Sequence, residues 1–381
     1  MFKLDKSGTF TVLHSFSVSD GAEPIAGLIT DSAGNLYGTT SVGGSDTVGC
    51  PGVGGSSGLQ PGCGTVFKLD SSGNLIVLHS FTKSEGEFPA AGLVMDSLGN
   101  LYGTTGSGGP SGGGTVFKLD TSGTLTVLHS LPAHGVSFQP EAGLILDSAG
   151  NLYGATINGG TSTACPGFGC GIIFRLDTSG NNFSVLHTFS GSDGALPLGG
   201  LTLDSVGNLY GTTLQGGSST PCPGIPNSLP GCGTVFKLDR SGNNFSVVHT
   251  FSGSDGALPR GSLTLDSAGN LYGMTQFGGS SGRGTVYLLA SSPQNATQVI
   301  VNQVNALCSQ GVLNSGQCNS LTRELDQAIS LLNKGKTAEA VQSLQDFVSE
   351  VQDLQNSGVL TASQAESLIS EANTVIGSLS S

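Results

Sequence analysis

Short apolar segments alternate with polar turns through the first 290 residues of the chain. Each segment is five to seven residues long, is rich in Val, Leu, Thr, Phe or Tyr, and is bounded by Gly, Asp, Ser or Pro. The shortest unit contains Ala91–Asp96, Asn100–Thr105, Gly114–Asp120 and Leu125–Ser130. Segments of this kind are typical of β-strands separated by tight turns. Because strands joined by such turns are antiparallel neighbours, the pattern predicts a four-stranded meander.

The same unit recurs along this part of the chain. Each copy contains the phrase Asp-Ser-x-Gly-Asn-Leu-Tyr-Gly, and the copies begin at Asp31, Asp96, Asp147, Asp204 and Asp266. Four strands repeated at this spacing indicate a β-propeller with one sheet per blade, since a solenoid would have shorter coils and a sandwich would not repeat its sequence. The sequence therefore predicts a mostly β fold followed by a different C-terminal part.

The ends of the repeated region suggest the number of blades. Six segments resemble Phe-Lys-Leu-Asp, and each of the other strand types occurs five times. We predict about five blades, with the N-terminal strand Thr11–Phe16 completing the last one; a sixth blade lost upstream is the alternative. Because Met1–Asp5 already matches Val66–Asp70, we expect the true start and any export signal to lie upstream, the alternative being a genuine cytoplasmic start.

After Ser291 the apolar positions take on the spacing of amphipathic helices. We predict helices around Leu321–Leu332 and Val341–Leu354, a third that opens at the capping box Thr361–Gln364, and a shorter one over Thr297–Cys308. Their apolar faces are expected to meet in a small all-α bundle. The predicted domains are a repeat propeller over 1–290, a linker over 291–296 and a helical domain over 297–381.

Composition excludes several functional classes. The formal net charge is -13, with 13 Lys and Arg and no basic cluster, so the chain lacks the positive footprint of a nucleic-acid-binding protein. No apolar run approaches the roughly 20 residues that span a bilayer, and no basic amphipathic stretch suggests binding to a membrane surface. We therefore expect neither a nucleic-acid partner nor a membrane span.

The eight cysteines occur as four pairs that are close in sequence: Cys50/Cys63, Cys165/Cys170, Cys222/Cys232 and Cys308/Cys318. The first three pairs lie in the loop after the Asn-Leu-Tyr-Gly strand, and repeats with a short loop there have no cysteine. Because each repeat has either two cysteines in this loop or none, the sequence predicts disulfides, and disulfides indicate an oxidising compartment. Zinc binding and reduced thiols are the alternatives, but neither a histidine nor a second cysteine pair accompanies Cys165-Pro-Gly-Phe-Gly-Cys170.

Five histidines share one repeated position, in the phrase Val-Leu/Val-His-Ser/Thr: His14, His79, His129, His187 and His249. A catalytic base would break the symmetry of the repeats, so equivalent histidines indicate structural hydrogen bonds within each blade. The alternative is a ring that lines a central channel and binds a metal or anion weakly.

Two further sets of residues also repeat. One aspartate per turn is typical of a hydrogen-bonding cap and not of a calcium loop, which needs several oxygen ligands; these caps include Asp5, Asp31, Asp70, Asp96, Asp120, Asp147, Asp177, Asp204, Asp239 and Asp266, with Asp20, Asp193 and Asp255 in Asp-Gly-Ala-x-Pro. The tyrosines of the Asn-Leu-Tyr-Gly strand are expected to pack between blades, with sugar stacking as the alternative: Tyr37, Tyr102, Tyr153, Tyr210 and Tyr272.

Candidate catalytic residues must break the repeat symmetry, and the sequence offers Glu85, Glu87, His134, Glu141 and Arg260. A pair such as Glu141 with His134 would suit a glycan hydrolase or lyase if both entered one cleft. Nothing in the sequence brings them together. We therefore predict no catalytic, cofactor-binding or metal-binding residues, and no cofactor.

The recurring phrases Gly-Asn-Leu-Tyr-Gly-Thr-Thr and Gly-Thr-Val-Phe-Lys-Leu-Asp resemble the tandem repeat of the bacterial choice-of-anchor family named after Gloeobacter and Verrucomicrobia, over about residues 1–290. The segment from Leu332-Asn-Lys-Gly-Lys-Thr to Gly358-Val-Leu-Thr resembles the FIMAH domain, over about residues 297–380. Both resemblances imply an exported bacterial protein, and the first implies no established enzymatic activity.

Together these features predict a secreted or surface-associated protein that binds polysaccharide or another macromolecule through its long loops, because variable loops on a rigid scaffold are where binding sites usually lie. The alternatives are an extracellular glycan-degrading enzyme and a purely structural spacer.

Overall fold

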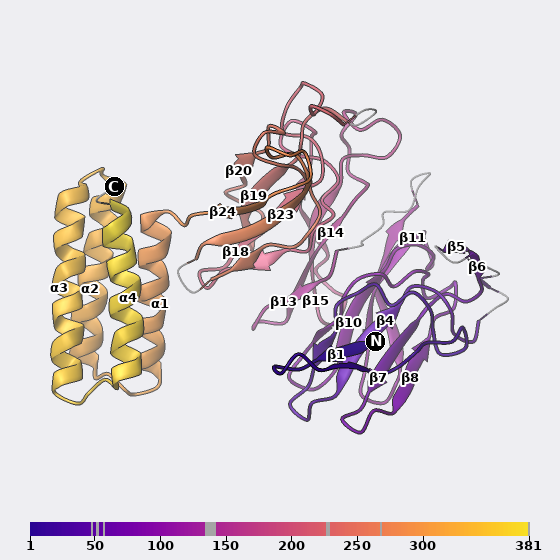
Figure 1. Ribbon diagram of the computed structural model, residues 1–381, viewed down its shortest axis with the longest axis horizontal. Helices are drawn as coiled ribbons and strands as arrows, with labels where there is room; N and C mark the ends of the chain where they lie inside the picture. The colour runs from indigo at the N-terminus through magenta and orange to yellow at the C-terminus, as the bar shows by residue number, and fades with distance from the viewer. Residues whose placement is uncertain are drawn as a thin grey trace. The chain divides into compact units, whose positions relative to one another are not determined.

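A computed structural model describes residues 1–46, 49–50, 53–55, 58–133, 142–225, 229–266 and 269–379 (Figure 1). The chain forms two compact units. The first comprises residues 1–202, 209–263 and 274–285, and the second comprises residues 203–208, 264–273 and 286–381. The first unit contains most of the β-structure, whereas all four helices of the described residues belong to the second.

Within the described residues, five four-stranded sheets follow one another along the chain, one for each copy of the repeat. Repeat 1 contains β3 (Ile29–Thr30), β4 (Leu36–Thr40), β7 (Thr65–Leu69) and β8 (Leu75–Ser80). Repeat 2 contains β9 (Val94–Met95), β10 (Leu101–Thr105), β11 (Gly112–Leu119) and β12 (Leu125–Pro132). Repeat 3 contains β13 (Ile145–Leu146), β14 (Asn151–Thr156), β15 (Ile172–Asp177) and β16 (Ser184–Thr188). Repeat 4 contains β17 (Thr202–Leu203), β18 (Asn208–Thr213), β19 (Thr234–Asp239) and β20 (Ser246–Thr250).

The predicted meander is confirmed in repeats 1 to 3, where each strand pairs antiparallel with the next. Repeat 5 departs from this order. In repeat 5, β23 (Leu271–Phe277) pairs with β22 (Thr264–Leu265) and β24 (Val286–Leu289), and its far end pairs with β21 (Ala257–Pro259).

The N-terminal residues form a hairpin of their own. β1 (Phe2–Leu4) pairs with β2 (Phe10–Val12), so the prediction that Thr11–Phe16 completes the last sheet is wrong. The reason is local: the Asp5 carboxylate accepts hydrogen bonds from the N–H groups of Ser7 and Thr9, both at 2.9 Å, which closes the turn between the two strands. A second small hairpin, β5 (Val53–Gly55) with β6 (Gly58–Gln60), lies in the long loop of repeat 1.

In the first three sheets a glycine lies directly opposite a phenylalanine, and in repeat 5 the ring of Tyr287 approaches the equivalent Gly273. The glycine of the Asn-Leu-Tyr-Gly phrase faces the phenylalanine of the Val-Phe-Lys phrase across the strands, in the pairs Gly38–Phe67, Gly103–Phe117 and Gly154–Phe174. These phenylalanine rings are fully buried. The ring lies over the space where a side chain on the glycine would be, so this position requires a residue without a Cβ.

Phenylalanine rings also join one repeat to the next. The ring of Phe81, just after β8, meets Phe117 of repeat 2 edge-on at 5.0 Å, and Phe189, just after β16, meets Phe236 of repeat 4 at 5.1 Å. Edge-to-face packing at these distances is favourable beyond the area that the rings bury. The hydrophobic core is therefore shared between consecutive sheets.

Aspartates cap the turns as the sequence predicts. In repeat 3, one oxygen of Asp147 accepts hydrogen bonds from the N–H groups of Ala149 and Asn151 at 2.9 and 2.8 Å. The other oxygen accepts the hydroxyl hydrogen of Tyr153 at 3.0 Å. Tyr102, Tyr153 and Tyr210 are buried, as expected for packing residues, whereas Tyr37 is half-buried and Tyr272 is 39% exposed, contrary to the expectation.

The C-terminal helices are α1 (Pro293–Ser309), α2 (Ser315–Asn333), α3 (Thr337–Asn356) and α4 (Ala362–Leu379), and they lie side by side in a bundle (Figure 1). Consecutive helices pack against each other, and α1 also contacts α4. Leu321, Leu344, Phe347 and Leu368 lie in one buried core. The predicted capping box is present, because Thr361 and Gln364 exchange hydrogen bonds at the start of α4. No helix in the described part of the chain is long and apolar enough to cross a bilayer.

We expect Gly154→Ala to destabilise the protein by roughly 1–3 kcal/mol, because an added methyl would lie 2.5 Å from the Phe174 ring and force the core to move. Gly27→Ala is the matched control, since a Cβ at Gly27 meets nothing within 4 Å. Urea denaturation of both variants measures the difference. Equal stability of the two variants would contradict the proposed role of the glycine.

Candidate functional site

An open cavity of about 550 Å³ lies between the loops of repeats 3 and 4. Both loops connect the second and third strands of their sheets, and each contains a disulfide, Cys165–Cys170 in repeat 3 and Cys222–Cys232 in repeat 4. Cavities of this size are typical of small-ligand sites. The cavity is therefore the candidate functional site of the first unit.

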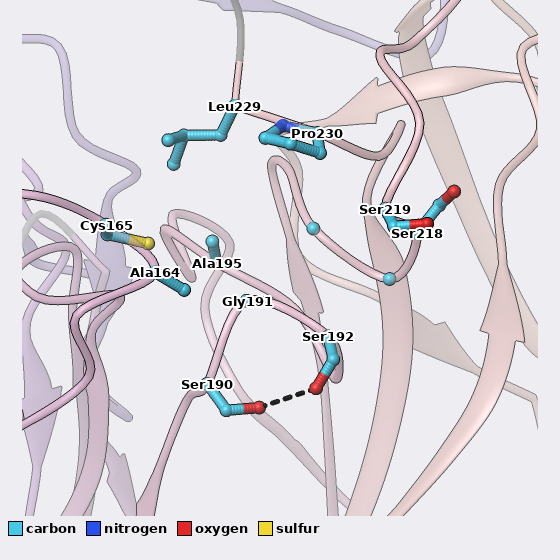
Figure 2. Close-up of a pocket in the computed structure, with 12 residues that line it drawn as sticks. Ala164, Cys165, Ser190, Gly191, Ser192, Ala195, Ser218, Ser219, Leu229 and Pro230 are labelled. Atoms are coloured by element: carbon cyan, nitrogen blue, oxygen red, sulfur yellow. Dashed lines mark hydrogen bonds between the residues drawn. The ribbon is translucent and has the colours of Figure 1, made fainter.

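Hydroxyl groups and small apolar groups line the cavity. Figure 2 shows Leu229 and Pro230 on one side, Ala164 and Cys165 on another, and serine hydroxyls around the remainder. The serines are Ser190, Ser192, Ser218 and Ser219. Among the described lining residues none is titratable, because the Cys165 sulfur is part of a disulfide. Such a lining can form hydrogen bonds and apolar contacts, but it supplies neither an acid nor a base.

A histidine–carboxylate contact positions the segment Ser190–Ser192, which lines the cavity. His187 Nε2 lies 3.0 Å from Asp193 Oδ2, to which it donates a hydrogen bond. The other oxygen of Asp193 accepts hydrogen bonds from the Ser190 N–H at 2.8 Å and the Ser190 hydroxyl at 2.9 Å. Ser190 in turn contacts the hydroxyl of Ser192 at 2.9 Å, the contact dashed in Figure 2. The strand β16 therefore fixes the loop that presents both serines.

The same histidine–carboxylate contact recurs in other repeats. The pairs are His14–Asp20, His79–Glu85 and His249–Asp255, at 3.0, 3.2 and 2.9 Å. The interpretation of these histidines as structural is confirmed for four of the five. The fifth, His129, instead stacks on Phe183 with ring centroids 3.7 Å apart, and burial lowers its pKa. Sequence reasoning identified both partners but missed their pairing, although the constant spacing of six residues could have revealed it.

Hydrogen bonding changes the acidity of these carboxylates. Burial raises the pKa of Asp193, but the hydrogen bonds from His187 and Ser190 outweigh it and bring the pKa below the ordinary value of 3.8. The pKa of Glu85 is likewise lowered, with burial again opposing the hydrogen bonds from Thr82 and His79. These groups are therefore charged hydrogen-bond acceptors over the whole neutral range.

Threonine hydroxyls close the base of the loops between the second and third strands. The Oγ1 atoms of the facing threonines lie 2.8 to 2.9 Å apart, in the pairs Thr40–Thr65, Thr105–Thr115, Thr213–Thr234 and Thr275–Thr285. The two members of a pair are 25, 10, 21 and 10 residues apart in sequence, respectively. The same contact thus closes loops of very different length.

The structure contains four disulfides, the pairs given above from the sequence: Cys50–Cys63, Cys165–Cys170, Cys222–Cys232 and Cys308–Cys318. A carboxylate oxygen of Glu87 lies 3.2 Å from the Cys50 sulfur, which brings two sulfurs and one carboxylate within 4.8 Å of one another. Metal ligation by cysteine requires thiolates, so this cluster does not provide a metal site while the disulfide is intact.

Of the residues that break the repeat symmetry, the structure describes Glu85, Glu87 and Arg260. Glu85 binds His79, Glu87 accepts a hydrogen bond from Ser107, and Arg260 is exposed. His134 and Glu141 lie outside the described residues. The cavity-lining segment Gly216–Ser219 was missed by sequence reasoning, since the same residues, Gly-Gly-Ser-Ser, recur at Gly278–Ser281 in repeat 5, whose own loop has no cysteine.

These observations define a tandem-repeat protein of four-stranded sheets with a helical C-terminal part. Residues 1–223 and 169–320 match the model of the Gloeobacter/Verrucomicrobia repeat, and the chain belongs to this family. Residues 297–377 match the FIMAH domain. Both resemblances noted from the sequence are therefore confirmed.

Solved structures show only weak similarity. TolB from Acinetobacter baumannii is 13% identical over 60% of this chain, with a TM-score of 0.37, and the chain spans 46% of its length. An α-L-arabinofuranosidase from Clostridium thermocellum is 14% identical over 68% of this chain and 83% of its own, with a TM-score of 0.35. An ulvan lyase of polysaccharide lyase family PL25 is 13% identical over 65% of this chain and 62% of its own, with a TM-score of 0.40. These TM-scores lie below 0.5, so nothing about this chain is concluded from them. No curated protein sequence matches the chain.

We expect the native protein to react with no thiol reagent, because every cysteine of the described residues is in a disulfide. After denaturation and reduction, all eight cysteines should react. Titration with a chromogenic thiol reagent measures both numbers. Reactive thiols in the freshly purified native protein would contradict the disulfide assignment.

We expect Asp193→Asn to destabilise the first unit by about 1–3 kcal/mol at neutral pH, because it removes a charged acceptor of three hydrogen bonds. The folded pKa lies below the unfolded value of 3.8, so this stabilisation is complete above pH 3.8 and is lost as the pH falls through the folded pKa. Urea denaturation at a series of pH values should show the wild-type advantage shrinking below pH 3.8. The exposed Asp353→Asn on α3 is the control, and a pH-independent difference for Asp193→Asn would refute the argument.

Proposed function

We propose that the protein is an extracellular binding protein, in which a β-propeller of about five blades presents disulfide-closed loops to a polysaccharide. The observation that carries the proposal is the open cavity between the two disulfide loops of repeats 3 and 4. Its volume and its serine hydroxyls suit the hydroxyl-rich surface of a saccharide, which is recognised by a few well-placed hydrogen bonds and apolar contacts.

The chemistry of the lining favours binding over cleavage. Glycoside hydrolysis uses a pair of carboxylic acids on either side of the scissile bond. The described lining residues offer hydroxyl, methylene and disulfide groups. The nearest carboxylate of the loop, Asp193, is engaged by His187 and Ser190 and caps the backbone. The hydroxyl and apolar groups of the lining are therefore sufficient for binding a saccharide.

The loops combine a rigid base with an exposed tip. Closing a loop of this size by a disulfide stabilises it by roughly 2–3 kcal/mol in the chain-entropy model, since the unfolded chain loses freedom. The aromatic ring of Phe168, within the Cys165–Cys170 loop, is 49% exposed. A preorganised loop loses little entropy when it binds, and an exposed ring offers a flat apolar face to a sugar.

Contacts between the sheets support a propeller. The Thr39 hydroxyl of repeat 1 donates a hydrogen bond to the Ala91 carbonyl of repeat 2 at 3.1 Å, and Thr202 of repeat 4 donates to Leu263 at 2.6 Å. These hydrogen bonds join a strand of one repeat, β4 or β17, to the segment just before the first strand of the next repeat, which supports an arrangement of neighbouring blades. In this proposal the blades occupy 1–290. The accessory helical domain, predicted over 297–381 after a linker over 291–296, begins earlier than predicted, because α1 starts at Pro293.

An extracellular location is part of the proposal. Four disulfides are common in proteins of oxidising compartments and rare in the cytosol. Three of the disulfides close loops of the repeats, where reduction would remove the constraint on the proposed binding face, and the fourth joins α1 to α2. We infer that the protein works outside the cytoplasm, at the cell surface or beyond it.

We expect a glycan array to identify at least one polysaccharide ligand, and Ser219→Trp to weaken its binding roughly tenfold or more, because the indole would fill the cavity. Ser281→Trp is the matched control, since Ser281 occupies the same position in repeat 5, in a short loop without a disulfide. Calorimetric titration of both variants with the identified glycan measures the difference. No ligand across a broad array would favour the structural spacer, and equal weakening by both variants would remove the cavity from the proposal.

A further inference from the structure

A row of tyrosine–cation pairs runs through the repeats. Tyr37 and Tyr102 lie opposite Lys68 and Lys118 in the register of their sheets, and each lysine Nζ lies over the tyrosine ring, at 5.6 and 5.9 Å from its centroid. Repeat 4 has the same contact, with the Nζ of Lys237 5.6 Å from the centroid of the Tyr210 ring. An ammonium group over an aromatic face is a favourable contact. The pair is therefore a structural element of the ordinary repeat.

Repeat 3 replaces this lysine by Arg175, which lies directly opposite Tyr153. An arginine differs from a lysine in its planar fork of five N–H donors, which matches a carboxylate or sulfate in two-point contact. The hydroxyl of Tyr153 is already used, since it donates to Asp147 at 3.0 Å. Arg175 therefore brings additional donors to a position where the other repeats have a single ammonium group.

A second arginine reaches the same place from the next repeat. The turn of repeat 4 has the form Asp-x-Ser-Gly, and its second residue is Arg240, where repeats 1 to 3 have Ser71, Thr121 and Thr178. This turn packs on β16 of repeat 3: a Cβ added to Gly242 would lie 2.6 Å from the Leu186 carbonyl oxygen, and Phe245 stacks on His187 at 3.6 Å. Because β16 is the neighbour of β15, the turn carries Arg240 toward Arg175 and Tyr153.

The electrostatics of Tyr153 agree with this placement. Burial, followed by the hydrogen bond to Asp147, raises the pKa of Tyr153 to about 12, while the positive charges of Arg175 and Arg240 act in the opposite direction. The corresponding tyrosine of repeat 2 is Tyr102, whose pKa is raised mainly by burial. The side chain of Thr178, the residue equivalent to Arg240, acts to lower that pKa. The charges of both arginines therefore act on Tyr153.

One donor of each arginine has no partner in the protein. The Nε atoms of Arg175 and Arg240 are shielded from solvent and have no hydrogen-bond partner. In the described part of the chain, neither guanidinium forms an ion pair with a carboxylate; Asp147 and Asp239 instead accept hydrogen bonds in their own turns. Buried donors without partners are costly, and two neighbouring like charges repel each other. A bound oxyanion would remove both penalties at once.

We propose that Arg175 and Arg240 form a binding site for an oxyanion, the carboxylate or sulfate group of an acidic saccharide. The site rests on the proposed polysaccharide-binding function and adds the class of polysaccharide to it. It is separate from the cavity, because Tyr153 and Arg175 lie toward the end of the sheet that carries the capped turns, whereas the cavity lies beyond Thr156 at the other end. In a protein with a net charge of -13, two convergent arginines provide a local positive site that selects an acidic chain over a neutral one.

The test restores the residues of the ordinary repeat. In the double variant Arg175→Lys, Arg240→Thr, the lysine matches Lys118 of repeat 2 and the threonine matches Thr178 of repeat 3. Its fold is therefore expected to persist, and circular dichroism checks this. The control is Lys237→Arg, which introduces an arginine at the same strand position of repeat 4. Each protein is titrated by calorimetry with a uronate oligosaccharide, a sulfated oligosaccharide and a neutral oligosaccharide of equal length.

We expect the wild type and the control to bind an acidic oligosaccharide, and the double variant to bind it roughly tenfold more weakly with its affinity for the neutral oligosaccharide unchanged. Comparison of the affinities for the uronate and the sulfated oligosaccharide shows which oxyanion is preferred. As a separate readout, sulfate should raise the melting temperature, relative to chloride of equal ionic strength, by more in the wild type than in the double variant, because general stabilisation by sulfate affects both proteins equally.

The outcomes separate the two proposals. Equal binding of the acidic oligosaccharide by wild type and double variant would overturn the arginine site while leaving the polysaccharide-binding function intact. Failure of every saccharide to bind, together with sulfate stabilisation that is larger in the wild type than in the double variant, would support the oxyanion site and remove the proposed function. Absence of both the binding and this difference in stabilisation would overturn both.

Discussion

The close approach of a phenylalanine ring to a glycine backbone is the contact on which the first unit depends. The glycine lies opposite the phenylalanine in each of the first three sheets, and the ring then meets an aromatic or aliphatic side chain of the preceding repeat. One side chain therefore holds a sheet together and also joins it to its neighbour. Since the glycine leaves room for no other residue, the repeated phrase is fixed by packing.

This contact separates the parts of the repeat that must stay constant from those that can vary. The strands, the capped turns and the histidine–carboxylate contacts recur with nearly the same geometry, whereas the loop between the second and third strands differs in length and in cysteine content. The cavity lies where two long loops meet. The repeated scaffold thus supplies rigidity, and the differences between repeats supply any specificity.

Much of this arrangement could be predicted from the sequence. Periodicity gave the strands, the helices and the capped turns, because these depend on local spacing and local hydrogen bonds. Pairing across the chain was harder: Thr11–Phe16 was expected to complete the last sheet, but the turn at Asp5 closes a local hairpin first. The Tyr153–Arg175–Arg240 cluster was also missed, since single substitutions in a repeat stand out only once the register brings them together.

The threonine contacts at the base of the loops have a consequence for the evolution and the engineering of this protein. The same pair of hydroxyls joins threonines that are 10 and 25 positions apart in sequence, so the contact does not depend on the length of the segment between them. We therefore expect that the segment between a pair of threonines can be exchanged for that of another repeat, or for a foreign peptide, without loss of the sheet. A repeat built in this way can change the length and the chemistry of one insert while its sheet remains as it was.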